Sequence, residues 1–389
     1  MTKGKAAYST VDGLISSLTS FLLVAITTRN IGQESSSFSF LLISLFVIIG
    51  FQRSTFGFQS LVNHFVRGAF LRNVGALLTL NFLLFFFGVY LAGLYIFDFN
   101  YSLWQVIVIC SLCSVQDYLR YTIASSLRYR ILIVYDLIPL FIVLLLFFSN
   151  QSGIRALFFW SLANLISIGF GVFSLKPWLH SIELESESSR GRDVFLARYP
   201  LDGVIGPLIT YLVVYVSHRT DPTLGVTLIF ICISSYSVVN VFATSSILWL
   251  VPTQRIQSKK PHFQTYFLGI FTGMLIFNLA CYMIYTQGNV GVYIYGLNFE
   301  YVRSLSPYFA ISSTFLAFIT FLSNFLKARN QVQSANKIKI IQALISAILF
   351  AVAMKIGGLT AIAIAELVTA AIVCVLVSIE ARRHFQRYV

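Results

Sequence analysis

The sequence predicts an all-α polytopic membrane protein with about twelve transmembrane helices, arranged as two parallel repeats of six. Three observations lead to this fold class: the composition, an internal repeat, and the alternating charge of the connectors. Apolar residues make up 57 % of the 389 residues and charged residues only 11 %, with a mean hydropathy of +0.82. A soluble domain carries about 25 % charged residues. The composition therefore excludes an ordinary soluble protein.

The apolar segments each have roughly the 20 residues that cross about 30 Å of hydrocarbon. The chain begins MTKGKAAYSTVDG and has no small-residue cleavage site before the first span runs on, so we expect that span to remain as an anchor. The predicted spans are 10–29, 38–60, 73–96, 103–125, 131–149, 154–175, 199–218, 223–248, 264–286, 306–326, 338–356 and 358–380.

An internal repeat supports the division into two halves. Residues 11–29 (VDGLISSLTSFLLVAITTR) return as residues 201–219 (LDGVIGPLITYLVVYVSHR). Aliphatic matches between apolar helices arise easily by chance, but an Asp at one end and an Arg at the other do not. A polar segment, the only connector of soluble composition, lies between the halves. We therefore predict an N-terminal lobe at 1–175, a cytoplasmic linker at 176–198 and a C-terminal lobe at 199–389.

The connectors alternate in their content of basic residues. One set holds twenty of the 27 Lys and Arg residues, the intervening set holds five, and Arg53 and Arg120 fall inside spans. This alternation satisfies the positive-inside rule, so both termini are predicted to be cytoplasmic. The net charge of +13 is explained by these basic connectors, which lie beside the phospholipid bilayer. We therefore expect no nucleic-acid partner.

Little in the sequence favours bond chemistry. The five cysteines all lie within predicted spans, and the five histidines have no metal-ligand spacing, so we expect neither a disulfide framework nor a metal or cofactor. A membrane enzyme, such as a glycan polymerase or acyltransferase, stays open as an alternative. It would be favoured by a long outer loop with paired Asp, Arg or His. The longest outer connector, 286–307, offers only Glu300 and Arg303.

Ionisable residues at membrane depth need a partner or a role, because each is costly to insert. Helix geometry predicts Arg53, Asp117, Arg120 and Asp136 at one level, in the inner third of the N-terminal lobe, beside Gln116. In one interpretation Arg53 and Arg120, with Asp117 and Gln116, bind an anionic headgroup. In the other, Asp117–Arg120 and Arg53–Asp136 are pairs that hold helices together. Asp136 is also a candidate for a gate or for ion coupling.

Each charged residue of the internal repeat has two possible interpretations. Arg29 and Arg219 are predicted at outer helix ends, where they either extend to the interface or contact an anionic substrate. Asp12 and Asp202 are predicted at cytoplasmic helix starts. There a carboxylate suits the helix dipole, and a share in an inner gate is the alternative.

Two further residues stand out inside spans. Glu366 is the deep carboxylate of the last predicted helix and a candidate for ion coupling. Pro207 removes a backbone hydrogen bond near the cytoplasmic end of the seventh. It is predicted to act either as a hinge or as a static kink.

Three short segments carry a resemblance to a known family: 116–121 (QDYLRY), 324–333 (NFLKARNQVQ) and 357–363 (GGLTAIA). Together with the predicted architecture, they resemble the polysaccharide-exporting branch of the MATE-like superfamily, which includes O-antigen and teichoic-acid flippases. Arg53 is similar in placement to a cavity arginine of the more distant lipid II flippases.

The resemblance implies a multi-pass protein of the bacterial cytoplasmic (inner) membrane that works by alternating access. The implied substrate is an undecaprenyl-diphosphate-linked oligosaccharide, moved from the inner to the outer leaflet for cell-surface polysaccharide synthesis, and a glycan polymerase is a candidate partner. The alternative is a cation-coupled multidrug exporter of the same fold. That function needs deep carboxylates in a lobe, and among the outer positions only Glu366 fits.

Overall fold

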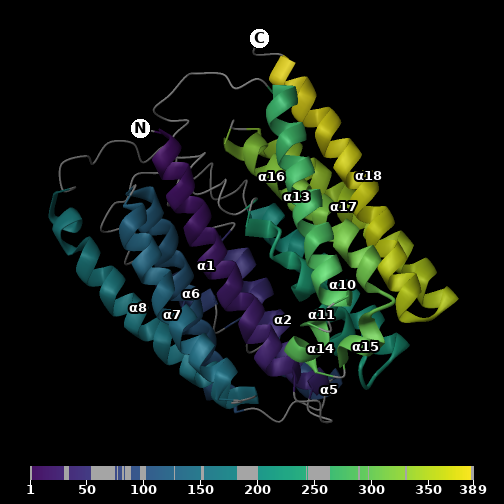
Figure 1. Ribbon diagram of the computed structural model, residues 1–389, viewed down its shortest axis with the longest axis horizontal. Helices are drawn as coiled ribbons and strands as arrows, with labels where there is room; N and C mark the ends of the chain where they lie inside the picture. The colour runs from purple at the N-terminus through teal and green to yellow at the C-terminus, as the bar shows by residue number, and fades with distance from the viewer. Residues whose placement is uncertain are drawn as a thin grey trace. The chain divides into compact units, whose positions relative to one another are not determined.

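All the helices and turns described below come from a computed structural model of the chain (Figure 1). In the part of the chain that the structure describes, the regular elements are helices and there is no strand. This confirms the predicted all-α fold class. The described residues are 2–29, 35–53, 75–76, 78–80, 83, 89–96, 102–126, 128–149, 153–181, 200–241, 243, 263–287, 290–296, 298–328 and 331–386.

The chain forms two compact units. The first comprises Met1–Leu23 and Phe40–Pro207, and the second comprises Val24–Ser39 and Leu208–Val389. Helix α1 (Thr2–Arg29) therefore contributes to both units. The predicted linker at 176–198 lies outside the described residues beyond Ser181, where α8 ends, so the predicted lobe boundaries remain a prediction.

In the first unit, α6 packs against α8, and α7 packs against both. Gly171 of α8 allows this close approach, because a Cβ there would lie 2.7 Å from a ring carbon of Tyr135. The Tyr135 hydroxyl donates to the Gln116 carbonyl at 2.8 Å, and this bond ties α7 to α6. The helices of this unit after α1 are α2 (Ser35–Gln52), which belongs to it from Phe40 onwards, α5 (Leu91–Ile96), α6 (Leu103–Ser125), α7 (Tyr129–Phe148) and α8 (Gly153–Ser181).

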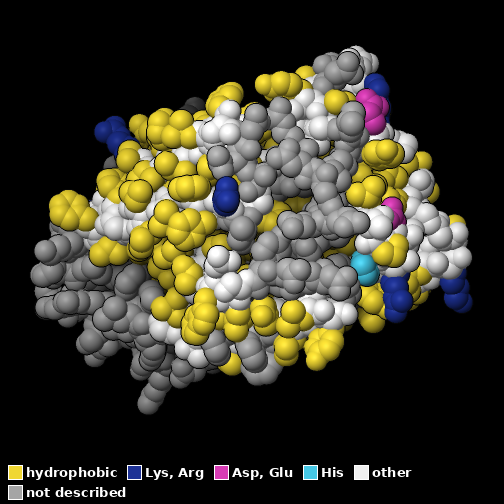
Figure 2. All heavy atoms as spheres, turned by 90° about the horizontal axis from the view of Figure 1, so that it is seen from below, with side chains coloured by type: hydrophobic (Ala, Val, Ile, Leu, Met, Phe, Trp, Pro, Cys, Tyr) yellow, Lys and Arg dark blue, Asp and Glu magenta, His cyan; other side chains and the backbone are white. Residues whose placement is uncertain are grey.

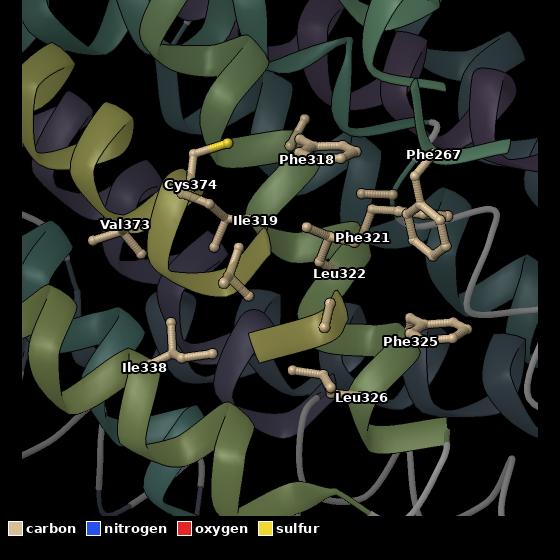
Figure 3. Packing of buried hydrophobic residues seen from close by; sticks show 14 of the residues in the cluster. Phe267, Phe318, Ile319, Phe321, Leu322, Phe325, Leu326, Ile338, Val373 and Cys374 are labelled. Atoms are coloured by element: carbon tan, nitrogen blue, oxygen red, sulfur yellow. The ribbon is translucent and has the colours of Figure 1, made fainter. Parts of the chain in front are cut away.

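In the second unit, α18 packs against α16 and α17, and α13 packs against α16. Their contact is a phenylalanine-rich core (Figure 3), in which the rings of Phe321 and Phe325 meet that of Phe267 edge-on at 5.5 and 5.2 Å. The helices are α10 (Pro200–Thr220), which belongs to this unit from Leu208 onwards, α11 (Gly225–Ser237), α13 (Phe263–Gln287), α14 (Val290–Tyr295), α15 (Asn298–Val302), α16 (Ser306–Ala328), α17 (Val332–Ile356) and α18 (Leu359–Gln386).

Eight helical segments among the described residues are long and apolar enough to cross a membrane. On the face seen in Figure 2, hydrophobic side chains make up much of the described surface, as lipid contact requires. Both observations support a multi-pass membrane protein. The eight segments are Tyr8–Ile26, Leu103–Ser125, Tyr129–Phe148, Arg155–Leu175, Phe267–Gln287, Ser306–Lys327, Val332–Ile356 and Leu359–Arg383.

Candidate functional site

Arg120 of α6 lies at the centre of a buried charge cluster in the first unit. Its side chain is 3 % exposed. Nη2 donates to Oδ2 of Asp12, on α1, at 2.5 Å, and Nε lies 2.6 Å from Oδ2 of Asp136, on α7. The Nε–H is not aligned with that oxygen, so this second contact is an ion pair without a hydrogen bond. One guanidinium thus joins three helices.

A second pair lies beside this cluster. Arg53, directly after α2, donates from Nη2 to Oδ1 of Asp117 at 2.7 Å and from Nε to Oδ2 at 3.2 Å. Its guanidinium also lies 5.8 Å from the ring centroid of Tyr121. The Arg53 side chain is 33 % exposed, against 10 % for Asp117. This forked pair is therefore open on the arginine side.

The ion pairs differ from the pairs predicted from the sequence. Asp117 pairs with Arg53, and Arg120 pairs with Asp12 and Asp136. The expected pairing of Asp117 with Arg120, and of Arg53 with Asp136, is therefore wrong. The reason is that Asp117 and Arg120, three residues apart on α6, reach towards different neighbouring helices.

Asp12 was expected first as a cap at a helix start, and this expectation is also wrong. Helix α1 begins at Thr2, so Asp12 lies several turns inside it, and its side chain is fully buried. The sequence signal was present, since Asp12 is one of the two charged matches of the internal repeat. The error came from placing the helix start near residue 10.

With Asp12 included, the five charges no longer balance. Two arginines face three aspartates, which leaves one excess negative charge when all are ionised. Gln116 adds a neutral donor, from Nε2 to Oδ1 of Asp136 at 3.3 Å. Every carboxylate of the cluster is thus held by an arginine, and Arg53 is the member with substantial exposure.

The cluster borders a hollow of about 60 Å³ inside the first unit. The Thr19 and Ser20 hydroxyls donate to their own helix backbone, so only their oxygens remain free to accept. The buried indole N–H of Trp160 has no hydrogen-bond partner among the described residues. The lining residues are Ser16, Thr19, Ser20, Phe46, Ile49, Arg53, Cys113, Gln116, Asp117, Asp136, Pro139, Trp160 and Asn164.

The other predicted site residues lie apart from this cluster. Arg219 is at the end of α10 in the second unit, on the ring of Tyr215. Glu366 lies within α18, half-buried, and makes no hydrogen bond or ion pair in the described part of the chain. Helices α1 and α10 include Arg29, Asp202 and Pro207, but their side chains lie outside the described residues.

No protein-family model and no curated protein sequence matches the chain. Solved structures match along nearly its whole length. An outward-facing multidrug resistance MATE family transporter of the MOP superfamily has 10 % identity and a TM-score of 0.68, with 98 % of this chain and 96 % of that chain covered. A MOP superfamily transporter from Pyrococcus furiosus has 11 % identity and a TM-score of 0.66, with 99 % and 96 % covered.

A eukaryotic MATE transporter has 13 % identity and a TM-score of 0.65, with 100 % of this chain and 99 % of that chain covered. At these identities the likeness concerns the course of the backbone, and it carries no residue roles. The predicted MATE-like architecture is confirmed on this ground: from end to end, the chain has the fold of the MATE transporters.

Proposed function

We propose that this chain is an alternating-access transporter that moves a lipid-linked oligosaccharide from the inner to the outer leaflet of the bacterial cytoplasmic membrane. The coarser part, a membrane transporter, is supported by the fold and by the apolar helices. The finer part rests chiefly on one observation. Of the five charges in the cluster, Arg53 is the one with a third of its side chain exposed.

The chemistry of the hollow supports this substrate class. The fork of Arg53 suits a phosphate or diphosphate, because two parallel donors match two phosphate oxygens. Its Nη1 group makes no hydrogen bond within the described part of the chain, so it offers free donors. Hydroxyl oxygens, the Gln116 and Asn164 amides and the Trp160 indole lie nearby, and these groups suit sugars.

Arg120 takes a different role in this proposal. Because its side chain is almost completely buried between Asp12 and Asp136, we assign it to holding α1, α6 and α7 together. Substrate binding would fall to Arg53, with Asp117 holding its guanidinium in place. Transport makes and breaks no covalent bond, so the proposal includes no catalytic residue.

A cation-coupled exporter is the second candidate, and a specific observation favours it. The excess of one carboxylate over the arginines in the cluster would be neutralised by a bound proton or cation. Two of the similar solved structures are described as multidrug transporters. Against this candidate, each of those carboxylates is already held by an arginine.

The test is removal of the gene from its host, followed by labelling of lipid-linked oligosaccharides. We expect them to accumulate on the cytoplasmic face, and the wild-type chain to restore their export. Arg53→Ala should fail to restore it, whereas Arg155→Ala should succeed, because Arg155 is exposed on α8 and lies outside the cluster. Unchanged export in the deletion strain would refute the proposal. Loss of dye efflux instead would favour the second candidate.

A further inference from the structure

A second hollow, of about 490 Å³, lies in the second unit, away from the charge cluster. It is formed where α10 ends and where α17 turns into α18. The topology predicted from the sequence places both of these helix ends on the outer side. Its lining residues are Tyr215, Arg219, Thr220, Met354, Gly357 and Gly358, and none of these is acidic.

Arg219 is held in position at the edge of this hollow. Its Nε donates to the Tyr215 hydroxyl at 3.1 Å, and its guanidinium lies 5.5 Å from the centroid of the same ring. Tyr215 is one helical turn earlier, so the guanidinium lies along the helix. Nη1 and Nη2 make no hydrogen bond or ion pair in the described part of the chain. Both terminal groups therefore remain available as donors.

The turn opposite Arg219 exposes backbone. Gly357 and Gly358 have φ of +80° and +84°, which an L side chain rarely adopts, and nothing lies within 4 Å of the position of a Cβ on either. The Gly358 N–H makes no hydrogen bond among the described residues. The Thr220 hydroxyl donates to the Val216 carbonyl, so it offers an acceptor only. The donors of the hollow are thus a guanidinium fork and backbone.

We propose that this hollow binds a phosphate group, carried by a lipid headgroup or present as a free anion. Two parallel N–H donors match two phosphate oxygens, and the described lining residues include no carboxylate to compete for them. The volume lies within the range of about 300–1,000 Å³ that is usual for small-molecule sites. Met354, 42 % exposed, supplies apolar contact for the rest of a lipid. This proposal is independent of the transported substrate.

The test uses the purified full-length chain in an uncharged detergent. Native mass spectrometry compares retention of phosphatidylglycerol with that of a diacylglycerol of the same chains, which lacks the phosphate. We expect phosphatidylglycerol to be retained preferentially, and Arg219→Gln to weaken its retention about tenfold, since charged hydrogen bonds are lost. Titration with inorganic phosphate forms the second arm. Phosphate binding lost in the same variant would identify a free anion as a ligand, whereas lipid retention alone would identify the headgroup.

Matched variants keep the test decisive. Arg155→Gln removes an exposed arginine of the other unit and should change neither arm. Met354→Trp takes up part of the hollow and leaves Arg219 unchanged, so it should reduce binding severalfold even if Arg219→Gln proves unstable. Equal losses in Arg219→Gln and Arg155→Gln would overturn the proposal. So would equal retention of both lipids by the wild type together with no binding of inorganic phosphate.

Discussion

The two units use the same packing pattern around different interiors. In the first, α8 packs against α6 and α7, and in the second, α18 packs against α16 and α17. The first interior holds five charged side chains joined by three ion-pair contacts. The second holds a cluster dominated by aromatic and aliphatic side chains (Figure 3).

This difference shows that helix packing and chemical role are separable in this chain. Ring packing stabilises through apolar burial and contact geometry, and it tolerates small shifts of the helices. A buried ion cluster tolerates much less, because removing one partner leaves an uncompensated charge. We therefore expect the effect of a substitution in the first unit to depend strongly on which charged residue is replaced. We also expect the candidate substrate site to lie in this unit.

The largest expected effect comes from Arg120→Met. This substitution leaves Asp12 and Asp136 buried without their partner, and breaking a buried ion pair in this way costs about 3–5 kcal/mol of unfolding free energy. The measurement is unfolding of the purified protein in detergent, compared with the wild type.

The triple variant Asp12→Asn, Arg120→Met and Asp136→Asn is the control for that prediction. It removes all three charges together, so much of the lost stability should return. If the single and triple variants unfold alike, the loss would reflect packing of the arginine stem, and the contrast between the two interiors would weaken.

One glycine in each unit tests close packing. A Cβ on Gly171 would lie 2.7 Å from a ring carbon of Tyr135, and a Cβ on Gly291 would lie 2.3 Å from the Phe299 ring. Alanine at either position should destabilise by about 1–3 kcal/mol, with the larger loss at Gly291 because its contact is shorter. Thermal unfolding of each variant measures which of the two losses of stability is larger.

Open glycines provide matched controls. A Cβ on Gly169, in the same helix as Gly171, or on Gly273 in α13, would meet nothing within 4 Å. Alanine at these two positions should be neutral or slightly stabilising, since glycine disfavours a helix by up to about 1 kcal/mol. A loss at Gly169 as large as that at Gly171 would show that the close contact with Tyr135 is not the cause.

The fold was largely predictable from the sequence, because membrane helices are marked by length and hydropathy alone. The predicted spans 103–125 and 131–149 match α6 and α7 within two residues at each end. The start of α1 was misplaced because its first turns are polar and carry Lys3 and Lys5, which hydropathy cannot distinguish from a connector.

The charge cluster was predictable in four of its five members, but its pairing was not. Helical rise places Arg53, Asp117, Arg120 and Asp136 at one depth, and the structure does bring them together. The partner of each charge depends on the rotation of every helix about its own axis and on the neighbour it faces. A single sequence fixes neither, so Asp12 was missed as a partner of Arg120.

The smallest expected effect lies outside both interiors, at the turn between α10 and α11. Burial opposes ionisation of Asp221, but its Oδ1 accepts from the Leu224 and Thr223 N–H groups and from the Thr223 hydroxyl, and together these bonds lower the pKa of Asp221. A lowered pKa means that the stability contributed by the ionised Asp221 side chain is complete at neutral pH and is lost below about pH 4. Asp221→Ala should thus lose about 1 kcal/mol at pH 7 and progressively less in acid. Unfolding of both proteins across this pH range tests the prediction, and a pH-independent difference would contradict it.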